Sequence, residues 1–319
     1  GNMMSEYTWL HVNPHLLSTS DTSMACETAT GTSGMLMAYS RVTDTPHKAA
    51  VGVYLTGAGC AEAEAWEAEL ETIRALRAGK SAVAQDARAR QKRALARSAH
   101  RLYEAWKHMK AHYGDPAEAC PEFEDTSDEL AWFMGHLAGA SSVQHDRAAS
   151  AAVNVPLDIP LHAAKGIACL DDATWFGVPS ALQALIWLSV PGATPEGEDP
   201  WKTLDGALVH ADTSGVRLAY LLKVKAELGA GKVDDAKRTM KAFAEARSAK
   251  EPPSKWTLLD LSAYDQVLAI SDRLWTEATG HRTPHLALGE FWDDASDMLE
   301  DEDLLDDIDA DDTAKETKP

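Results

Sequence analysis

The stretch VRLAYLLKVKAELGAGKVDDAKRTMKAFAEARSAKEPP, from Val216 to Pro253, decides the fold of this chain. Apolar residues in its first half recur at helical spacing, at Leu218, Leu221, Val224 and Leu228. A Gly-Ala-Gly run at 229–231 ends that helix, and a second apolar series follows at Val233, Ala236, Met240 and Phe243. Two short helices joined by a glycine turn cannot bury both apolar faces alone, so the stretch predicts an all-α fold of stacked helix hairpins.

The glycine turn and the second helix of this stretch resemble part of a tetratricopeptide repeat. The match covers residues 226–236 and ends in GKVDDA at 231–236, but it lacks the early Trp and the Leu-Gly pair of that family. The resemblance implies an irregular stack of antiparallel helix hairpins, arranged as a tetratricopeptide-like superhelical bundle. It implies nothing about a ligand.

The 319 residues are enough for one large helical domain or two smaller ones. We expect an irregular N-terminal segment over 1–20, an all-helical repeat-like domain over 21–292 and a disordered acidic tail over 293–319. A Gly-Asp-Pro break followed by an acidic, proline-containing loop makes 114–126 the best internal boundary. No apolar run reaches the ~18 residues that a membrane span requires.

Much of the net charge of −20 lies in the tail. Residues 293–319 hold 13 acidic residues against two lysines, which gives −11 and leaves −9 for the rest of the chain. Such density of like charge predicts disorder in the tail. Basic residues gather only on an expected helix at 83–113, where they could attract an anionic partner or neutralise the acidic helix expected at 61–79. Neither part of the chain has the concentrated basic surface of a nucleic-acid-binding protein.

The four cysteines are Cys26, Cys60, Cys120 and Cys169. No two of them form a CxxC motif, which disfavours a zinc knuckle or a redox motif. Two disulfides allow three connectivities, and we favour 26 with 60 and 120 with 169 because each pair would join consecutive helical elements. The alternative is four buried free thiols in a cytosolic protein.

No catalytic or metal-binding motif is evident. The chain lacks GxSxG, a phosphate-binding loop, HExxH and the kinase set. His108 and His112 have the spacing of a helical metal pair but no third ligand, and Gly57-x-Gly59 lacks the third glycine of a dinucleotide site. We therefore expect a non-enzymatic protein without a cofactor or a metal.

Aromatic residues are the best candidates for ligand contact. Ten Trp stand against five Phe, and several lie between 130 and 190 on short helices broken by Gly and Pro. Such side chains can wall an apolar pocket between helix pairs, although Trp in a helical stripe is more often part of the core. The predicted ligand-binding residues are Trp132, Phe133, Trp175, Phe176 and Trp187, with Tyr220 from the opening stretch. The best polar cluster is Asp272, Arg273, His281 and Arg282, which could equally close the last helical turn.

The middle of the chain is similar to TatT proteins, which are all-helical repeat lipoproteins associated with TRAP transporters. The resemblance covers about 90–250 and rests on ALARSAHRLYEAWKHMKAHY at 94–113, DELAWFMGHLAG at 128–139 and the helix pair at 172–188. It implies a periplasmic, non-enzymatic bundle with a cavity, tethered to a membrane by an N-terminal lipid upstream of the given residues. A related helical protein occurs in bacterial sterol-trafficking systems, and the aromatic-rich middle suits such a cargo.

The first functional hypothesis is a periplasmic binding or shuttling component of a transport system. It would hold a largely apolar small molecule, a sterol or another lipid, between its helices and would contact membrane-transport proteins. The second is a helical scaffold for protein–protein interaction. The third is a TatT-like accessory for organic-acid uptake.

Overall fold

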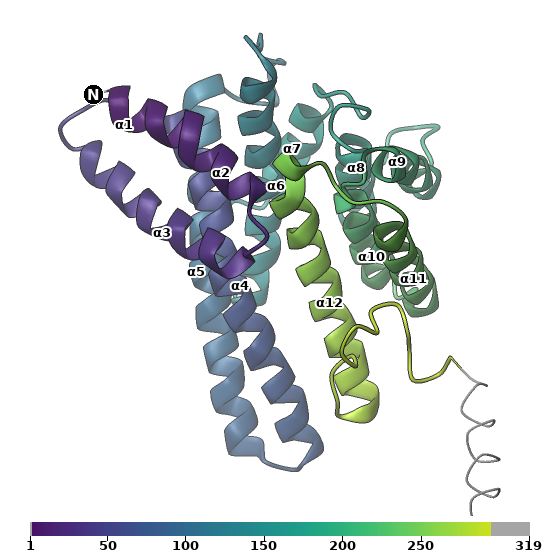
Figure 1. The fold of residues 1–319 in the computed structure, drawn as a ribbon. Coiled ribbons are helices and arrows are strands. Elements are labelled where there is room, and N and C mark those ends of the chain that lie inside the picture. Colours follow the sequence, from purple (N-terminus) through teal and green to yellow (C-terminus); the bar gives the residue numbers. More distant parts are fainter. Residues whose placement is uncertain (1, 295–319) are drawn as a thin grey trace, which may run out of the picture.

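The computed structural model of the chain describes residues 2–294 (Figure 1). Within this range the chain is helical and contains no strand, which confirms the predicted fold class. The predicted tail lies outside the described residues apart from Asp293 and Asp294. These two carboxylates pair with Lys237 at 2.6 Å and Lys241 at 2.5 Å, so the chain after the last helix lies against α11 (Val233–Ala249).

The two longest helices, α4 (His47–Arg77) and α5 (Ser81–Tyr113), form an antiparallel hairpin (Figure 1). Its seam is narrow because the buried positions of α4 include a series of alanines at helical spacing: Ala58, Ala61, Ala65 and Ala68. On the outer surface Arg90 pairs with Glu71, and Arg97 with Glu64. The basic face of α5 therefore partly neutralises the acidic helix beside it, as one of the two interpretations predicted.

Helix α6 (Thr126–Ala148) packs closely against α5. Gly135 and Gly139 make this approach possible, because a side chain at either position would collide with Met109 or Trp106 of α5. The hydrophobic core continues from these α5 residues into α6 and beyond. The predicted boundary at 114–126 is thus a loop between packed helices of one core.

The N-terminal segment departs from the prediction. Residues 2–18 are helical, in α1 (Asn2–Tyr7), a π-helical turn η1 (Thr8–Val12) and α2 (Asn13–Ser18), where an irregular segment was expected. Pro14 lies in the first turn of α2, directly after the π-helical turn η1. Helix α3 (Thr22–Tyr39) then runs back and is capped by Asp21.

The second half contains shorter helices. They are α7 (Ile159–Ile167), α8 (Val178–Ser189), α9 (Pro200–Ser214), α10 (Leu218–Gly229) and α11, followed by a 3-10 turn η2 (Ser254–Trp256) and α12 (Thr257–Thr279). Helices α10 and α11 form the predicted hairpin. Helix α12 contacts both α10 and α4 and so joins the two halves (Figure 1). The closer likeness to a tetratricopeptide superhelix stays a prediction.

Two disulfides connect the chain as the favoured pairing predicted. Cys26 on α3 is bonded to Cys60 on α4, and Cys120 in the loop before α6 is bonded to Cys169 after α7. No free cysteine remains in residues 2–294, so the alternative of four free thiols is wrong. Disulfides persist in oxidising environments, which makes the structure compatible with an extracytoplasmic compartment.

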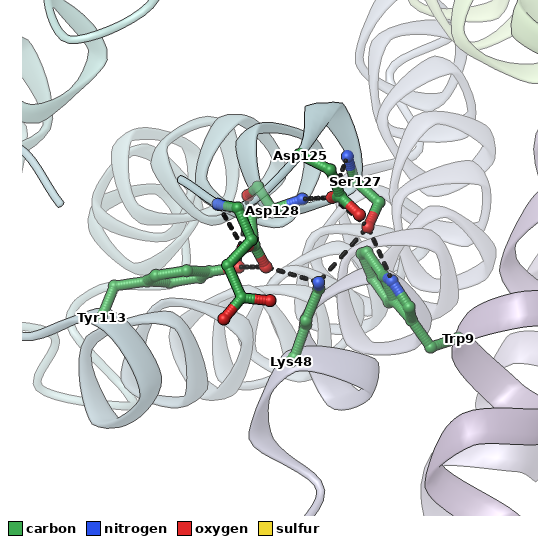
Figure 2. Close-up of polar contacts among 7 residues, drawn as sticks. Trp9, Lys48, Tyr113, Asp125, Ser127 and Asp128 are labelled. Atoms are coloured by element: carbon green, nitrogen blue, oxygen red, sulfur yellow. Dashed lines mark hydrogen bonds and ion pairs between the residues drawn. The ribbon is translucent and has the colours of Figure 1, made fainter. Parts of the chain in front are cut away.

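A polar network fixes the start of α6 against three other elements (Figure 2). Asp125 caps the helix by accepting from the backbone N–H of Ser127 at 2.8 Å. Asp128 pairs with Lys48 of α4 and accepts from the Tyr113 hydroxyl of α5 at 3.0 Å. The Trp9 indole of η1 donates to the Ser127 hydroxyl at 3.2 Å. The network therefore ties together the N-terminal segment, the long hairpin and α6.

Burial alone would raise the pKa of Asp128. Hydrogen bonds from Lys48, from the Glu124 backbone N–H and from Tyr113 outweigh burial and hold the pKa of this carboxyl below its usual value. A carboxyl with a lowered pKa stabilises the fold above the pKa of the unfolded chain, and this contribution is lost as the pH falls through the folded-state pKa.

Replacing Asp128 by Asn should lower the free energy of unfolding at pH 7 by about 2 kcal/mol, because three donors lose a charged acceptor. The difference from wild type should shrink below about pH 4, where the unfolded-state carboxyl takes up its proton. Urea unfolding between pH 3 and pH 7 measures both effects. The control is Asp205→Asn, since the Asp205 side chain is 65 % exposed in its pair with Lys223 and should change stability by less than about 0.5 kcal/mol. An Asp128→Asn effect as small as the control, or one independent of pH, would contradict this account.

The disulfides close segments with sequence separations of 34 and 49 residues. Replacing either cysteine pair by serines should lower the free energy of unfolding by about 2–4 kcal/mol, since the unfolded chain regains the entropy that each bond removes. Peptide mapping under non-reducing conditions tests the connectivity itself. A bond between Cys60 and Cys120, or free thiols in the denatured oxidised protein, would refute the pairing.

Candidate ligand cavity

A partly open cavity of about 190 Å³ lies where the two halves of the molecule meet. Side chains from α2, α3, α4, α5, α6, α10 and α12 form its walls. These walls are largely apolar and include Leu55, Leu102, Met134, Leu221, Leu222 and Leu259. The corner between α2 and α3 closes one side through Leu17, Thr22 and Cys26, and the Cys26–Cys60 disulfide fastens this corner to α4.

Helix α10 supplies the most regular wall. Leu218, Leu221 and Leu222 lie at helical spacing and all line the cavity. Lys225 follows them at the next position of the same face and lines the cavity as well. The apolar face of the opening stretch therefore ends in a lysine ammonium group inside the molecule. Its Nζ donates to Gln266 Oε1 of α12 at 2.7 Å.

Glu62 of α4 is the acidic group at this end of the cavity. Its side chain is 17 % exposed, and its Oε1 lies 2.9 Å from Nε2 of His145 on α6. Nδ1 of His145 lies 2.9 Å from the hydroxyl of Ser98 on α5. Ser98, His145 and Glu62 thus form a chain of three side chains that orients the Glu62 carboxylate.

The two charged groups influence each other. Burial raises the pKa of Glu62, but the charge and hydrogen bond of His145 and the charge of Lys225 outweigh it, and the pKa falls below its usual value. Burial lowers the pKa of Lys225, and the charge of Glu62 opposes this only in part. Asp265 also lines the cavity, and burial raises the pKa of its carboxyl despite a hydrogen bond with Thr22 and the charge of Arg247.

The Ser98, His145 and Glu62 side chains have the residue types of a nucleophilic triad but not its geometry. Ser98 has no exposed surface, lies in the middle of α5 and does not line the cavity. Its hydroxyl therefore cannot reach a bound molecule, which a nucleophile must do. The three residues act as a positioning chain for Glu62. The expectation that the protein is not an enzyme stays a prediction.

The aromatic residues predicted from the sequence lie elsewhere. Trp132, Phe133 and Trp175 have no exposed surface, and Phe176 is 4 % exposed. Phe133 stacks on Trp175 with ring centroids 4.8 Å apart. The indole N–H of Trp132 donates to the Gly166 carbonyl and that of Trp175 to Glu129, each at 2.8 Å. These side chains pack α6 against α7 and α8, which is the core interpretation that the sequence left open.

Trp187 is partly buried on α8, and Tyr220 lines a separate, more polar pocket in which its hydroxyl donates to Asp212 at 2.9 Å. None of the six predicted aromatic residues lines the apolar cavity. Ligand contact by them stays a prediction. The polar cluster predicted near the chain end helps to close the fold, since Arg282 pairs with Glu67 of α4 and Asp272 accepts from the Thr283 backbone N–H at 3.1 Å.

Sequence reasoning missed Trp66, Glu62 and Lys225. Trp66 lies one turn after Glu62 on α4 and lines the cavity. One signal was available, because two lysines interrupt the apolar run LAYLLKVKAEL. Lys223 forms ion pairs with Asp205 and Glu227 at 2.6 and 3.2 Å, whereas no carboxylate of residues 2–294 lies within 4.0 Å of the Lys225 ammonium. A lysine in an apolar helix without an acidic partner at i±3 or i±4 marks a candidate site.

Comparison with protein-family models, curated proteins and solved structures finds no match to this chain. The class of protein is thus defined by its structure, an all-α, disulfide-bonded protein with a mainly apolar, partly open cavity that has charged groups on its wall. In the described part of the chain, no helix is both long and apolar enough for a membrane span. Residues 2–294 also hold no group of three or more His, Cys, Asp or Glu side chains placed to bind a metal ion.

Lys225 should reduce stability, not increase it. A lysine whose pKa is lowered by folding destabilises the folded state at every pH at which the unfolded chain holds the proton. Replacing Lys225 by Met should therefore leave the free energy of unfolding at pH 7 unchanged or raise it. The matched control is Lys223→Met, which leaves the buried Glu227 without its ammonium partner and should cost about 2 kcal/mol. A comparable loss in both variants would show that Lys225 has a structural role.

Proposed function

We propose that this protein is a non-enzymatic binding and shuttling component of a periplasmic transport system, and that it holds a largely apolar small molecule in the cavity beside α10. The observation that supports this best is the combination of apolar walls with one charged end. Ligand sites typically combine an apolar lining with a few placed polar groups that orient the ligand. A lysine that lowers the stability of the fold and lines a cavity is typical of a functional residue.

The cavity volume limits the ligand. An apolar cavity of about 150 Å³ accommodates benzene, and pockets for larger ligands span about 300–1,000 Å³. At about 190 Å³ the cavity takes a small amphiphile or the tail of a larger one. A sterol is larger than this space, so only part of it would lie inside the cavity.

The periplasmic location, the N-terminal lipid anchor and membrane-transport partners come from the TatT resemblance and belong to the proposal. The two disulfides are compatible with it because the periplasm is oxidising. A nucleic-acid partner is not part of it. A TatT-like role in organic-acid uptake would use Lys225 as the cation, but Glu62 at the same end of the cavity opposes an anion.

A protein-interaction scaffold is the second candidate, and one surface favours it. Apolar side chains are exposed at helical spacing on the N-terminal helices, at Met3, Tyr7 and Leu10 and again at Met35 and Tyr39, and Val42 is exposed in the turn after α3. Exposed apolar stripes of this kind often mark contact surfaces. A scaffold of this kind would use the outer surface of α1 and α3 and would leave the cavity without a role.

Binding of 1-octanol tests the cavity directly, with Trp66 as the reporter. Burial of about seven methylene groups at ~0.8 kcal/mol each predicts a Kd of about 0.1–1 mM. We expect a saturable change in tryptophan fluorescence that Trp66→Phe abolishes. Native mass spectrometry of gently purified protein would show whether a natural ligand of similar character is retained.

Leu222→Trp should fill the cavity and eliminate octanol binding. Val209→Trp is its matched control, since Val209 is 63 % exposed on α9 and its replacement should leave the Kd unchanged. Saturable binding that survives Leu222→Trp would place octanol elsewhere and contradict the proposal. The absence of saturable binding to the wild-type protein would do the same.

A further inference from the structure

The charged end of the cavity holds two opposite charges that do not form an ion pair. Glu62 of α4 and Lys225 of α10 both line the cavity. No ion pair within 4.0 Å joins them, although ion pairs at this cutoff occur throughout residues 2–294. The cavity wall therefore carries an ammonium group and a carboxylate that do not satisfy one another.

Both groups keep unused hydrogen-bonding capacity toward the cavity. The Lys225 ammonium has three N–H donors, and Gln266 takes one of them. Ionised Glu62 has two acceptor oxygens, and His145 approaches Oε1. His145 in turn contacts the Ser98 hydroxyl, and these two contacts restrict the rotation of the Glu62 carboxylate. Two oriented polar groups thus face the cavity from opposite helices.

These two groups set a simple chemical requirement. An ammonium group can only donate hydrogen bonds, and an ionised carboxylate can only accept them. A head group that satisfies both must accept from Lys225 and donate to Glu62. A hydroxyl or a primary amide does both. A carboxylate is attracted by Lys225 but has no donor for Glu62 and is repelled by its charge. An amine in its ammonium form is attracted by Glu62 but has no acceptor for Lys225 and is repelled by its charge.

We propose that the cavity selects neutral amphiphiles whose head group both donates and accepts hydrogen bonds, with an alcohol or primary amide placed between Glu62 and Lys225 and the apolar chain against the leucines of α10. This inference rests on the function proposed above and specifies its ligand class. The wall holds no second cation, and further hydrogen bonds can come from its other polar residues: Thr22, Ser23, Thr56, Ser141, Ser262, Asp265 and Gln266.

A matched series of eight-carbon ligands tests the selection. The probes are 1-octanol, octanamide, octanoate and octylamine, each titrated into the full-length protein at pH 7.5 by isothermal titration calorimetry. Octanol and octanamide should bind at least about 10-fold more tightly than octanoate and octylamine, because a charged head leaves one buried group unpaired and faces a like charge. Octanoate or octylamine binding as tightly as octanol would overturn the inference while leaving the cavity function intact. Failure of all four to bind would overturn the cavity function itself.

Two variants should change the selectivity in opposite directions. Glu62→Gln removes the charge that repels an anion. The affinity for octanoate relative to that for octanol should therefore rise by at least about 5-fold. Lys225→Met removes the charge that repels a cation, so the affinity for octylamine relative to that for octanol should rise instead. Lys223→Met serves as the control, because Lys223 does not line the cavity and its loss should leave the ratio of octanol to octylamine unchanged. Thermal unfolding confirms that each variant is folded at the assay temperature. Parallel weakening of all four ligands in both variants would overturn the assignment of the head-group site.

Discussion

A helix that is apolar on both sides must be buried on both sides, and α10 is that helix in this protein. One side packs on α8, α9 and α11, while the other contacts α12 and lines the cavity. Burial of the second side requires the two halves of the molecule to come together. They do so incompletely, and the space that remains is the cavity. The corner between α2 and α3 and the disulfide at Cys26 close it from the N-terminal side.

The unpaired charge of Lys225 at the cavity lowers the stability of the fold. Elsewhere in the core, buried charges are paired, as Arg217 and Asp260 show at 2.8 Å with side chains 1 % exposed. Lys225 instead donates to a neutral amide, and Glu62 is held by His145, which in turn contacts Ser98. Removing one member of a buried ion pair is strongly destabilising, whereas removing a charge that was never paired is not. This contrast separates a structural charge from one that a ligand would satisfy.

Much of the fold could be predicted from the sequence because local rules determine it. The apolar periodicity of 216–253 predicted the α10–α11 hairpin. The spacing of the cysteines favoured the correct pairing. The N-terminal helices were missed because few signals distinguish a helix with Pro14 in its first turn from a turn.

The candidate site was harder to predict because it depends on contacts between distant elements. Tryptophans between 130 and 190 suggested a pocket, but their indole N–H groups find partners within the core, so nothing in the local sequence separated Trp132 from Trp66. Glu62, His145 and Ser98 come from three helices and show no joint pattern along the chain. Only Lys225 could be recognised in the sequence, as a lysine on an apolar helix face without an acidic residue at i±3 or i±4.

The most direct test of the account is an NMR measurement of where the ligand lies. With leucine and methionine methyl groups labelled, nuclear Overhauser effects from the octanol chain identify the side chains that surround it. The account predicts contacts to the methyl groups of Met134, Leu221 and Leu222, which line the cavity. Contacts confined to exposed methyl groups such as Met35, or none at saturating octanol, would contradict it.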